Sequence, residues 1–159
     1  MPAVDHLVCF ALYAANRTTT QAYRVLLEPW NLTYPQYIAL VTLWTDGDQS
    51  VTSLGEALQL DSGTLSPMLA RMEAAGYVTR TRRSADERVV TVSLTPRGTA
   101  LRTELAHVPR CIAAGSGLPD VDSARELIDA LHQLTEAMKD LRDHPEPVIA
   151  ASRAPRTTA

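Results

Sequence analysis

The apolar positions between residues 52 and 98 repeat in the order helix, helix, strand, strand. A first helix is expected from about Thr52 to Leu60, with Thr52 as its N-cap. A second helix follows, capped by Asp61 or Ser62. Its apolar residues recur at intervals of three and four, and they are Leu65, Met68, Leu69 and Met72. We therefore expect this helix to bury one face and to expose the other.

The exposed face of the second helix carries short polar side chains near its leading end. Short hydroxyl side chains let the backbone approach a phosphate, which the positive end of the helix dipole attracts. The candidate DNA-binding residues on this helix are Ser62, Gly63, Thr64, Ser66, Pro67 and Arg71. Because Pro67 lies inside the helix, we expect a late start or a slight bend. A packed helical hairpin of unknown use is the alternative.

Alternating apolar and polar residues then predict a two-stranded ribbon. Gly76 has the position of a left-handed cap after the second helix. The strands are expected over residues 77–82 and 89–94, with a polar hairpin tip over residues 83–88. The charged candidate DNA-binding residues of this ribbon are Arg80, Arg82, Arg83, Asp86 and Arg88. A solvated face is the alternative interpretation of these charges.

Positive charge is concentrated in this part of the chain. From Arg71 to Arg102 there are seven basic and three acidic residues, a balance of +4. The rest of the chain carries eight basic and fifteen acidic residues, a balance of −7, so the net charge is −3. Concentrated positive charge neutralises phosphates and steers association with nucleic acid. The local charge therefore favours double-stranded DNA as the partner over both alternatives.

Long apolar helices flank this module. One is expected over residues 5–28, ended by Pro29, and a buried helix follows the turn at residues 31–35. Behind the ribbon we expect one helix over residues 96–112, which Pro109 kinks or ends.

The last predicted helix runs from about Asp120 to Arg142. Its apolar residues step by four, three, four and three, and they are Leu127, Leu131, Leu134, Met138 and Leu141. Such a row is typical of a coiled-coil seam. One core cannot easily use both this seam and the first helix, so we assign both to a homodimer interface. The alternative is a seam that closes the core of a monomer.

The composition is that of a globular protein, since 45% of the 159 residues are hydrophobic and 21% are charged. We expect a mainly α fold with a small β-wing, in which a winged helix-turn-helix accompanies a helical dimerisation domain. The predicted regions are a first dimerisation helix at residues 1–30, the winged helix-turn-helix at 34–98, further dimerisation helices at 99–142 and a disordered tail at 143–159.

Several functional classes lack their signals in the sequence. With two cysteines and four histidines, the chain has no CxxC pair and no HExxH motif, so we expect no metal and no other cofactor. The apolar run at residues 7–15 follows Asp5 and no basic residue, which argues against export. No run is long enough to span a bilayer. We therefore expect a cytoplasmic protein without a membrane partner, with its cysteines mostly reduced at rest.

Cys9 is the first candidate for reactive chemistry. It lies in the opening turns of the first predicted helix, where the helix dipole favours a thiolate, and Tyr13 follows one turn later. A lone cysteine buried in an apolar helix is, however, more often inert. From the residues alone, Cys9 is either a reactive thiol or part of the packing.

Three segments of the chain resemble the MarR family of winged-helix regulators. They are LDSGTLSPML at residues 60–69, RME at 71–73 and DER at 86–88. Within that family the chain is most similar to the organic hydroperoxide resistance regulators, over about residues 5–142. The resemblance implies a symmetric dimer that places its second helix in adjacent major grooves of the DNA operator.

The resemblance also implies roles for the residues of the wing. By motif position, Arg88 is the arginine that enters the minor groove. Asp86 is expected to brace the wing by pairing with an arginine, and the alternative is an exposed acid without a role.

The same resemblance places the family's peroxide-reactive cysteine at Cys9. By position relative to Cys9, Tyr23 and Tyr34 match a tyrosine pair that the partner subunit donates. Two phenol hydroxyls can stabilise a thiolate by hydrogen bonding, as can Tyr13. Ordinary amphipathic interface tyrosines are the alternative. Apolar neighbours such as Phe10 are expected to favour an organic hydroperoxide as the inducer over hydrogen peroxide.

A second cysteine completes the redox hypothesis. The family includes a subgroup in which a C-terminal cysteine resolves the oxidised first one, and Cys111, 102 positions after Cys9, is placed to be that residue. Peroxide would convert the Cys9 thiolate to a sulfenic acid, with which Cys111 of the other subunit would form a disulfide. The alternative is that Cys111 is a passive core thiol.

Three functions fit the sequence. The first is a transcriptional repressor that leaves its operator when an organic hydroperoxide oxidises Cys9. The second is a MarR-type regulator released by a small phenolic or drug-like ligand, with the cysteines unused. The third is a thiol peroxidase, which we disfavour because one cysteine on a DNA-binding scaffold suits stoichiometric sensing. We therefore expect a regulator and not an enzyme.

Overall fold

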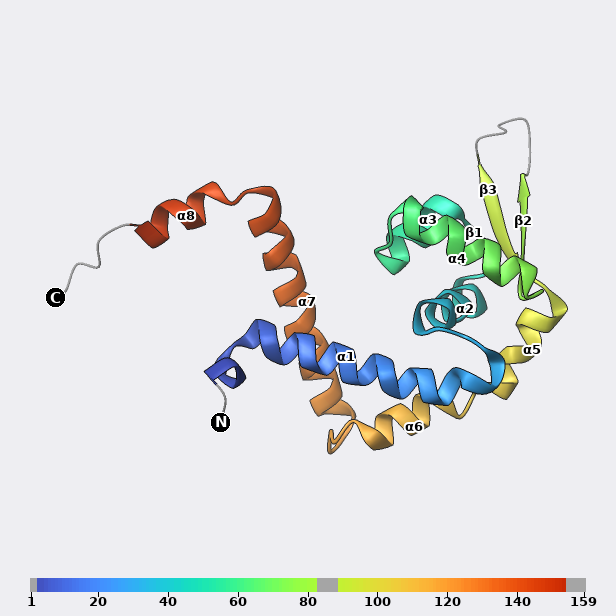
Figure 1. Cartoon of the computed structure of the whole chain (residues 1–159), viewed down its shortest axis with the longest axis horizontal. Coiled ribbons are helices and arrows are strands. Elements are labelled where there is room, and N and C mark those ends of the chain that lie inside the picture. The colour runs from blue at the N-terminus through green and yellow to red at the C-terminus, as the bar shows by residue number, and fades with distance from the viewer. Residues whose placement is uncertain (1–2, 83–88, 154–159) are drawn as a thin grey trace. The chain divides into compact units, whose positions relative to one another are not determined.

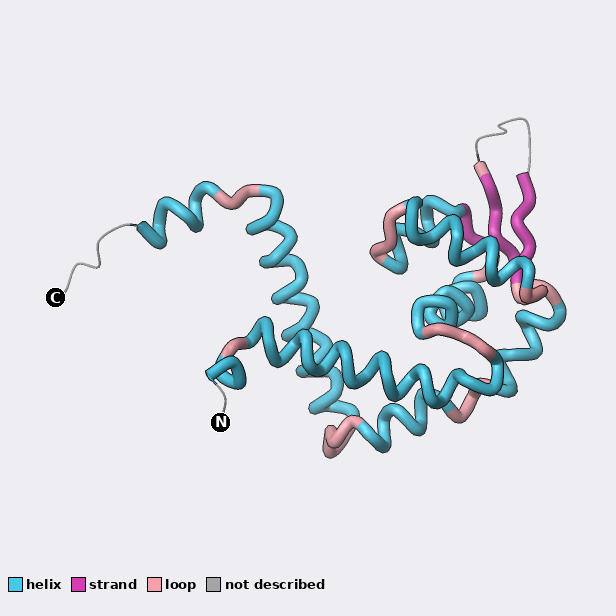
Figure 2. The backbone as a smooth tube through the Cα atoms, viewed as in Figure 1, coloured by secondary structure: helices cyan, strands magenta, loops and turns pink. Residues whose placement is uncertain are grey.

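The computed structural model describes residues 3–82 and 89–153. The chain divides into two compact units, Met1–Ile112 and Ala113–Ala159. Figure 1 shows the elements in chain order, and Figure 2 shows that helices predominate over one small sheet. The prediction of a mainly α fold with a small β-wing is confirmed. The predicted regions 1–30 and 34–98 belong to the same unit.

The described elements have the following bounds. Two short 3-10 helices are η1 Ala3–His6 and η2 Glu28–Trp30. The α-helices are α1 Val8–Leu27, α2 Tyr34–Asp46, α3 Val51–Leu58, α4 Ser62–Ala74, α5 Pro96–Glu104, α6 Val108–Gly115, α7 Val121–Asp143 and α8 Glu146–Arg153. The strands are β1 Gln49–Ser50, β2 Val78–Arg82 and β3 Val90–Leu94. Among the residues that the structure describes, each helix is too short or too polar to cross a bilayer.

Helix α2 lies at the centre of the first unit, where it contacts α1, α3, α4, α5 and β3. Its buried residues Tyr37, Leu40 and Leu43 join Leu54 of α3 and Leu69 of α4 in one hydrophobic core. Figure 1 shows α2 enclosed between α1 and the α3–α4 pair. The predicted buried helix after residues 31–35 is therefore confirmed.

The turn between α3 and α4 depends on Gly55 and Gln59. Gly55 is buried, and a Cβ at this position would meet the Leu60 carbonyl oxygen at 3.1 Å and the Leu65 side chain at 3.2 Å. Gln59 ends α3 in the left-handed conformation, with a φ of 53°. The predicted cap of α3 is wrong, because Ser50 and not Thr52 accepts the hydrogen bond from the backbone of the first turn. The helix consequently begins at Val51.

Helix α4 begins at Ser62 with Asp61 as its N-cap, so Pro67 does not delay its start. The expected late start is therefore wrong. At the other end, the Tyr77 N–H donates to the Met72 carbonyl at 3.0 Å and the Gly76 N–H to the Glu73 carbonyl at 2.9 Å. With a φ of 75° at Gly76, these bonds form the glycine-terminated helix end that the sequence predicts.

The sheet has the order β1–β3–β2, and both pairings are antiparallel. Val78 pairs with Leu94 and Arg82 with Val90, so β2 and β3 form the predicted ribbon. Each strand begins one residue later than predicted. The strand β1 was not predicted, because two residues are too few to show an alternation of apolar and polar side chains. It is defined only by its pairing with β3.

Two further predicted helices, those over residues 5–28 and 96–112, have different bounds in the structure. The first breaks at Leu7, so α1 begins one residue before Cys9 and ends at Leu27. The helix predicted over residues 96–112 divides into α5 and α6 ahead of Pro109. Both halves still bury apolar residues, as Leu101 of α5 and Val108 of α6 show.

The second unit contains α7, whose N-cap is Asp120, and α8. The bounds of α7 agree with the helix predicted from Asp120 to Arg142. Residues 146–153 form α8 and are not the disordered tail that the composition predicted.

Candidate functional site

The candidate DNA-binding residues of α4 share one solvent-facing surface. Their side chains are all exposed, and they are Ser62, Gly63, Thr64, Ser66, Pro67 and Arg71. The apolar residues of the opposite face, Leu65, Met68, Leu69 and Met72, are buried. The helix therefore exposes the predicted face. Arg71 makes no ion pair with any described residue.

The leading end of α4 is already occupied by a carboxylate. Asp61 Oδ1 accepts a hydrogen bond from the Thr64 N–H at 2.9 Å, and Asp61 Oδ2 accepts one from the Thr64 hydroxyl at 3.3 Å. A phosphate approaching this end meets a negative cap as well as the helix dipole. The expected attraction of phosphate to the α4 N-terminus is therefore weaker than the hydroxyls alone suggested.

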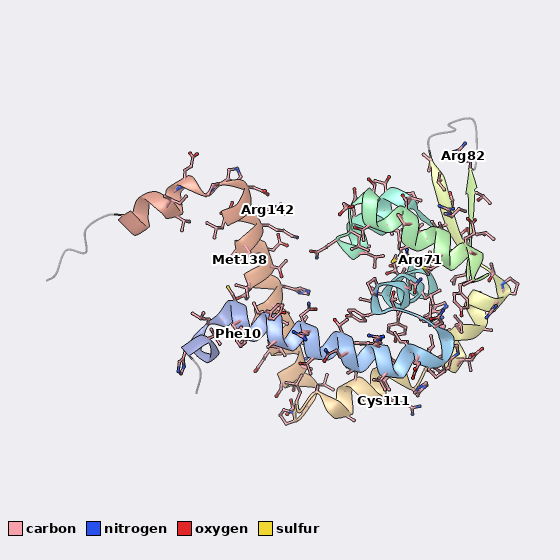
Figure 3. The ribbon with its side chains drawn as sticks, in the orientation of Figure 1. Phe10, Arg71, Arg82, Cys111, Met138 and Arg142 are labelled. Atoms are coloured by element: carbon pink, nitrogen blue, oxygen red, sulfur yellow. The ribbon has the colours of Figure 1, made fainter. Side chains whose placement is uncertain are left out.

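Arg80 and Arg82 face different surroundings. Glu73 of α4 accepts hydrogen bonds from the Arg80 backbone N–H at 2.9 Å and from the Arg80 guanidinium at 2.8 and 2.9 Å. These bonds from Arg80 lower the pKa of Glu73. Arg80 thus joins β2 to α4. Arg82 is exposed at the far end of β2 (Figure 3).

The remaining wing candidates, Arg83, Asp86 and Arg88, lie outside the described residues. Their roles stay predictions.

The two cysteines are both exposed and neither forms a disulfide in this chain. Cys9 is the second residue of α1, beside Phe10 and one turn before Tyr13. The ring centroids of Phe10 and Tyr13 lie 6.3 Å apart. The predicted helix over residues 96–112 would place Cys111 at its end, whereas the structure places Cys111 in the middle of α6 (Figure 3). The exposure of both thiols argues against the alternative that either is a core thiol of the single chain.

The candidate tyrosines form a cluster at the junction of α1 and α2. The ring centroids of Tyr23 and Tyr34 are 4.3 Å apart, and those of Tyr23 and Tyr37 are 5.7 Å apart. Burial, followed by the proximity of Tyr34, raises the pKa of Tyr23 and of Tyr37. Both phenols therefore stay protonated at neutral pH and can donate hydrogen bonds. Tyr37 was not predicted for this cluster, although its spacing of three from Tyr34 on a helix was a usable signal.

One chain does not bring Cys9 to this tyrosine cluster. Cys9 and Tyr23 are fourteen residues apart on the same helix, and at the rise of an α-helix this separation is about 21 Å. Only Tyr13, with a spacing of four, lies on the same face next to Cys9. The thiol and the tyrosine pair can therefore meet only if the pair comes from a second copy.

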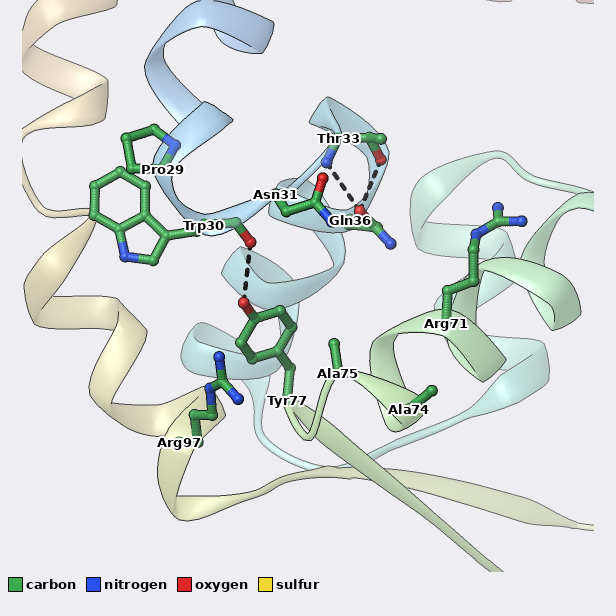
Figure 4. A pocket seen from close by; sticks show the side chains of 10 residues that line it. All are labelled: Pro29, Trp30, Asn31, Thr33, Gln36, Arg71, Ala74, Ala75, Tyr77 and Arg97. Carbon is green, nitrogen blue, oxygen red and sulfur yellow. Dashed lines mark hydrogen bonds between the residues drawn. The ribbon is translucent and has the colours of Figure 1, made fainter.

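A cavity of about 610 Å³ opens between η2, α2, α4 and α5 (Figure 4). Gln36 Oε1 accepts from the Thr33 N–H at 2.9 Å and from the Thr33 hydroxyl at 3.1 Å, which leaves the amide N–H groups of Gln36 as donors. Arg71 and Arg97 add two guanidinium groups, and the Arg97 group lies 5.0 Å from the centre of the Tyr77 ring. The lining residues include no acid, so the cavity suits a small anion.

Comparison with known proteins identifies the family. A family model described as transcriptional regulator SarA/Rot matches residues 21–105, more than half of the chain. The chain is also 42% identical over 135 residues to the organic hydroperoxide resistance transcriptional regulator of Bacillus subtilis, a match that covers 85% of this chain and 91% of that protein. The chain belongs to the SarA/Rot and MarR type of winged-helix transcriptional regulators.

Two solved states of AbfR from Staphylococcus epidermidis resemble this winged-helix regulator. Reduced AbfR bound to DNA has 32% identity and a TM-score of 0.71, over 85% of this chain and 94% of that one. Disulfide-formed AbfR has 33% identity and a TM-score of 0.59, over 88% of this chain and 92% of that one. The members of this family are DNA-binding transcriptional regulators, so the thiol peroxidase interpretation is wrong.

Proposed function

We propose that this regulator is a homodimeric repressor that senses organic hydroperoxides through Cys9. The observation that carries the proposal is the separation of an exposed thiol from a partly buried tyrosine pair on one helix, since only a second copy can complete the site. The AbfR states and the Bacillus subtilis regulator, which is named for organic hydroperoxide resistance, support a redox function.

Exposed apolar residues provide surfaces for a second copy. On α7 the predicted seam exposes Leu127, Leu131 and Met138, with 45%, 37% and 46% of their surfaces accessible. On α1, Val8 and Val25 are 65% and 71% exposed. The α7 residues follow one helical row, and an exposed apolar row of this kind marks an interaction site. We assign both surfaces to the dimer interface, as the sequence predicted.

In this dimer the Cys9 thiolate attacks the terminal oxygen of the hydroperoxide. An S–O bond forms, the O–O bond breaks, and the alkoxide leaves and takes up a proton to become the alcohol. Tyr23 and Tyr34 of the other copy donate hydrogen bonds to the thiolate beforehand, with Tyr13 adjacent. The apolar Phe10 beside Cys9 favours the organic oxidant over hydrogen peroxide.

The sulfenic acid on Cys9 then reacts with Cys111 of the other subunit. The S–S bond forms as the S–O bond breaks, and the oxygen leaves as water. A disulfide requires its two Cα atoms to come within about 7 Å. In the proposed cycle this requirement draws the helix ends together and shifts the subunits. Half-sites on DNA lie about 34 Å apart, and a displaced pair of α4 helices cannot contact both major grooves at once.

A DNA-shift assay combined with a non-reducing gel tests the proposal. The wild type, Cys9→Ser and Cys111→Ser are each incubated with and without an organic hydroperoxide such as cumene hydroperoxide. We expect the wild type to leave DNA and to run as a crosslinked dimer that dithiothreitol reverses, while Cys9→Ser stays bound. Release of the Cys9→Ser protein by the oxidant would refute the proposal. Release of the wild type without the crosslinked band would exclude Cys111 as the resolving residue.

Release by a small organic ligand is the second candidate, because the cavity beside Arg71 and Arg97 suits an anion. The test is a DNA-shift assay of Cys9→Ser with an aromatic carboxylate such as salicylate. Release that Arg97→Gln abolishes would favour this candidate, and continued binding at millimolar ligand would exclude salicylate-like ligands.

A further inference from the structure

A continuous row of aromatic contacts leads from the tyrosine pair along α2. The Tyr37 ring lies 5.7 Å from Tyr23 and 6.4 Å from Trp44, to which it presents an edge at 71°. Tyr37 is buried, with 6% of its surface exposed, so it fills the space between its neighbours. Edge-to-face pairs at these separations are energetically favourable. Any change in the packing of the tyrosine pair therefore reaches Trp44 through one side chain.

Trp44 connects this row to α5 by a hydrogen bond. Its indole N–H donates to the Gly98 carbonyl at 2.9 Å. Arg102 of α5 donates to the Trp44 carbonyl at 3.4 Å, so α2 and α5 are joined twice at this point.

Gly98 lies directly against the end of the recognition helix α4. A Cβ on Gly98 would overlap the carbonyl oxygen of Tyr77, the residue that closes α4 by donating to Met72. Thr95 ties the same place together, because its hydroxyl donates to the Gly76 carbonyl at 2.6 Å and accepts from the Gly98 N–H at 3.0 Å. The position of Gly98 thus determines where the C-terminal end of α4 is held.

We propose that Trp44 is a positioning residue, which transmits the packing of the Tyr23–Tyr34 pair through Gly98 to α4. The inference rests on the proposed function in so far as the tyrosine pair is the sensing end. The group that makes the connection is the indole N–H of Trp44. Its removal leaves the Gly98 carbonyl without this donor, while the ring contact with Tyr37 can persist. The substitution Trp44→Phe removes this N–H together with part of the ring volume, and the control Trp30→Phe makes the same truncation at the other tryptophan.

The test is a double-mutant cycle on DNA affinity without any oxidant. Dissociation constants for an operator fragment are measured by fluorescence anisotropy for the wild type, Tyr34→Ala, Trp44→Phe and the double variant. Variants are compared at concentrations where they elute like the wild type and show its circular dichroism. We expect each single change to weaken binding about 3- to 10-fold, within the range of measured couplings. The double variant should be no weaker than the weaker of the two single variants, because both changes interrupt one route.

The other tryptophan provides a matched control. The Trp30 indole N–H donates to Glu104 at 2.6 Å, and no hydrogen bond among the described residues joins the Trp30 side chain to Gly98. Trp30→Phe keeps the main-chain carbonyl of residue 30, which accepts from the Tyr77 hydroxyl at 3.0 Å. In a Trp30→Phe background, Tyr34→Ala should weaken DNA binding as much as it does in the wild type. Multiplicative effects of Tyr34→Ala and Trp44→Phe, or an unchanged affinity of Tyr34→Ala, would overturn the inference.

The cycle is separate from the test of the redox proposal, because no variant in it is oxidised. A non-additive cycle together with release of Cys9→Ser by hydroperoxide would support the role of Trp44 and refute the proposed sensor. An additive cycle together with normal oxidative release would refute the role of Trp44 alone.

Discussion

Two parts of the molecule differ in how much of their apolar surface one chain buries. They are the DNA-binding part, α2 to β3, and the thiol end of α1, residues 8–13. In the first, Leu40, Leu54 and Leu69 are fully buried and every helix is held by several neighbours. In the second, Val8 and Tyr13 are 65% and 58% exposed. Among the described residues, one chain therefore packs the helices of the winged helix-turn-helix fully and leaves the thiol end of α1 exposed.

This difference explains how a chemical signal can reach DNA. In the proposed function, oxidation at a thiol site shared between copies changes the relative position of the two DNA-binding parts. In the further proposal, the contacts from Tyr37 through Trp44 to Gly98 add a smaller change at α4 within each copy.

The largest expected effect comes from Gly98→Ala. Because its Cβ would overlap the Tyr77 backbone, which cannot move like a side chain, we expect the free energy of unfolding to fall by about 3 kcal/mol. Gly115→Ala is the matched control, since nothing lies within 4 Å of the added atom, and its effect should stay below about 1 kcal/mol. Urea denaturation followed by circular dichroism measures both. Equal effects would show that the α4–α5 junction tolerates displacement.

The next effect concerns the exposed seam of α7. Leu131→Glu places a charge in the proposed dimer interface and should raise the dimer dissociation constant about tenfold or more, which corresponds to about 1.4 kcal/mol. Ala130→Glu adds the same charge beside the seam and should leave the dimer unchanged. Analytical ultracentrifugation distinguishes them. If both variants remain dimers at low micromolar concentration, the seam belongs to the core of the second unit.

A smaller effect is expected at the leading end of α4. Asp61→Ala removes the hydrogen bond to the Thr64 N–H and should destabilise the fold by about 1 kcal/mol. The same change removes a negative charge near the phosphates, so DNA binding by the folded protein should become tighter. Asp61→Asn, which keeps the cap without the charge, separates the two effects. Weaker DNA binding by Asp61→Asn would show that the carboxylate itself contributes to recognition.

The smallest expected effect distinguishes the two strand arginines. Arg82→Ala should reduce the slope of log affinity against log salt by about 1, as expected when one phosphate contact is lost. Arg80→Ala should change this slope less, because Glu73 already pairs with Arg80. Anisotropy titrations at several salt concentrations measure both slopes. A larger change for Arg80→Ala would place Arg80 on the phosphates.

The sequence predicted those features that depend on local patterns. The apolar spacing of α4, the helix end at Gly76 and the strands β2 and β3 all follow from neighbouring residues, and all appear in the structure. Strand β1 depends on pairing with β3, about forty residues away, which no local pattern contains. The break between α5 and α6 was hidden because Leu101, Leu105 and Val108 keep their helical spacing across it.

The candidate site was predictable in its residue types and not in its arrangement. The resemblance to the hydroperoxide resistance regulators indicated Tyr23 and Tyr34, and the structure places their rings together. The connection of Trp44 to Gly98 joins residues 54 positions apart through one side chain, so no local pattern indicates it. The same holds for Glu73 and Arg80, whose pairing depends on how β2 returns beside α4.

The most direct test of the shared site uses mixed dimers purified through two different tags. One copy carries Cys9→Ser with its tyrosines intact, and the other carries Tyr23→Phe and Tyr34→Phe with Cys9 intact. The account predicts that the single Cys9 of the mixed dimer is oxidised by cumene hydroperoxide as fast as in the wild type, because the first copy supplies the tyrosines. Oxidation as slow as in the homodimer of the tyrosine variant would contradict it.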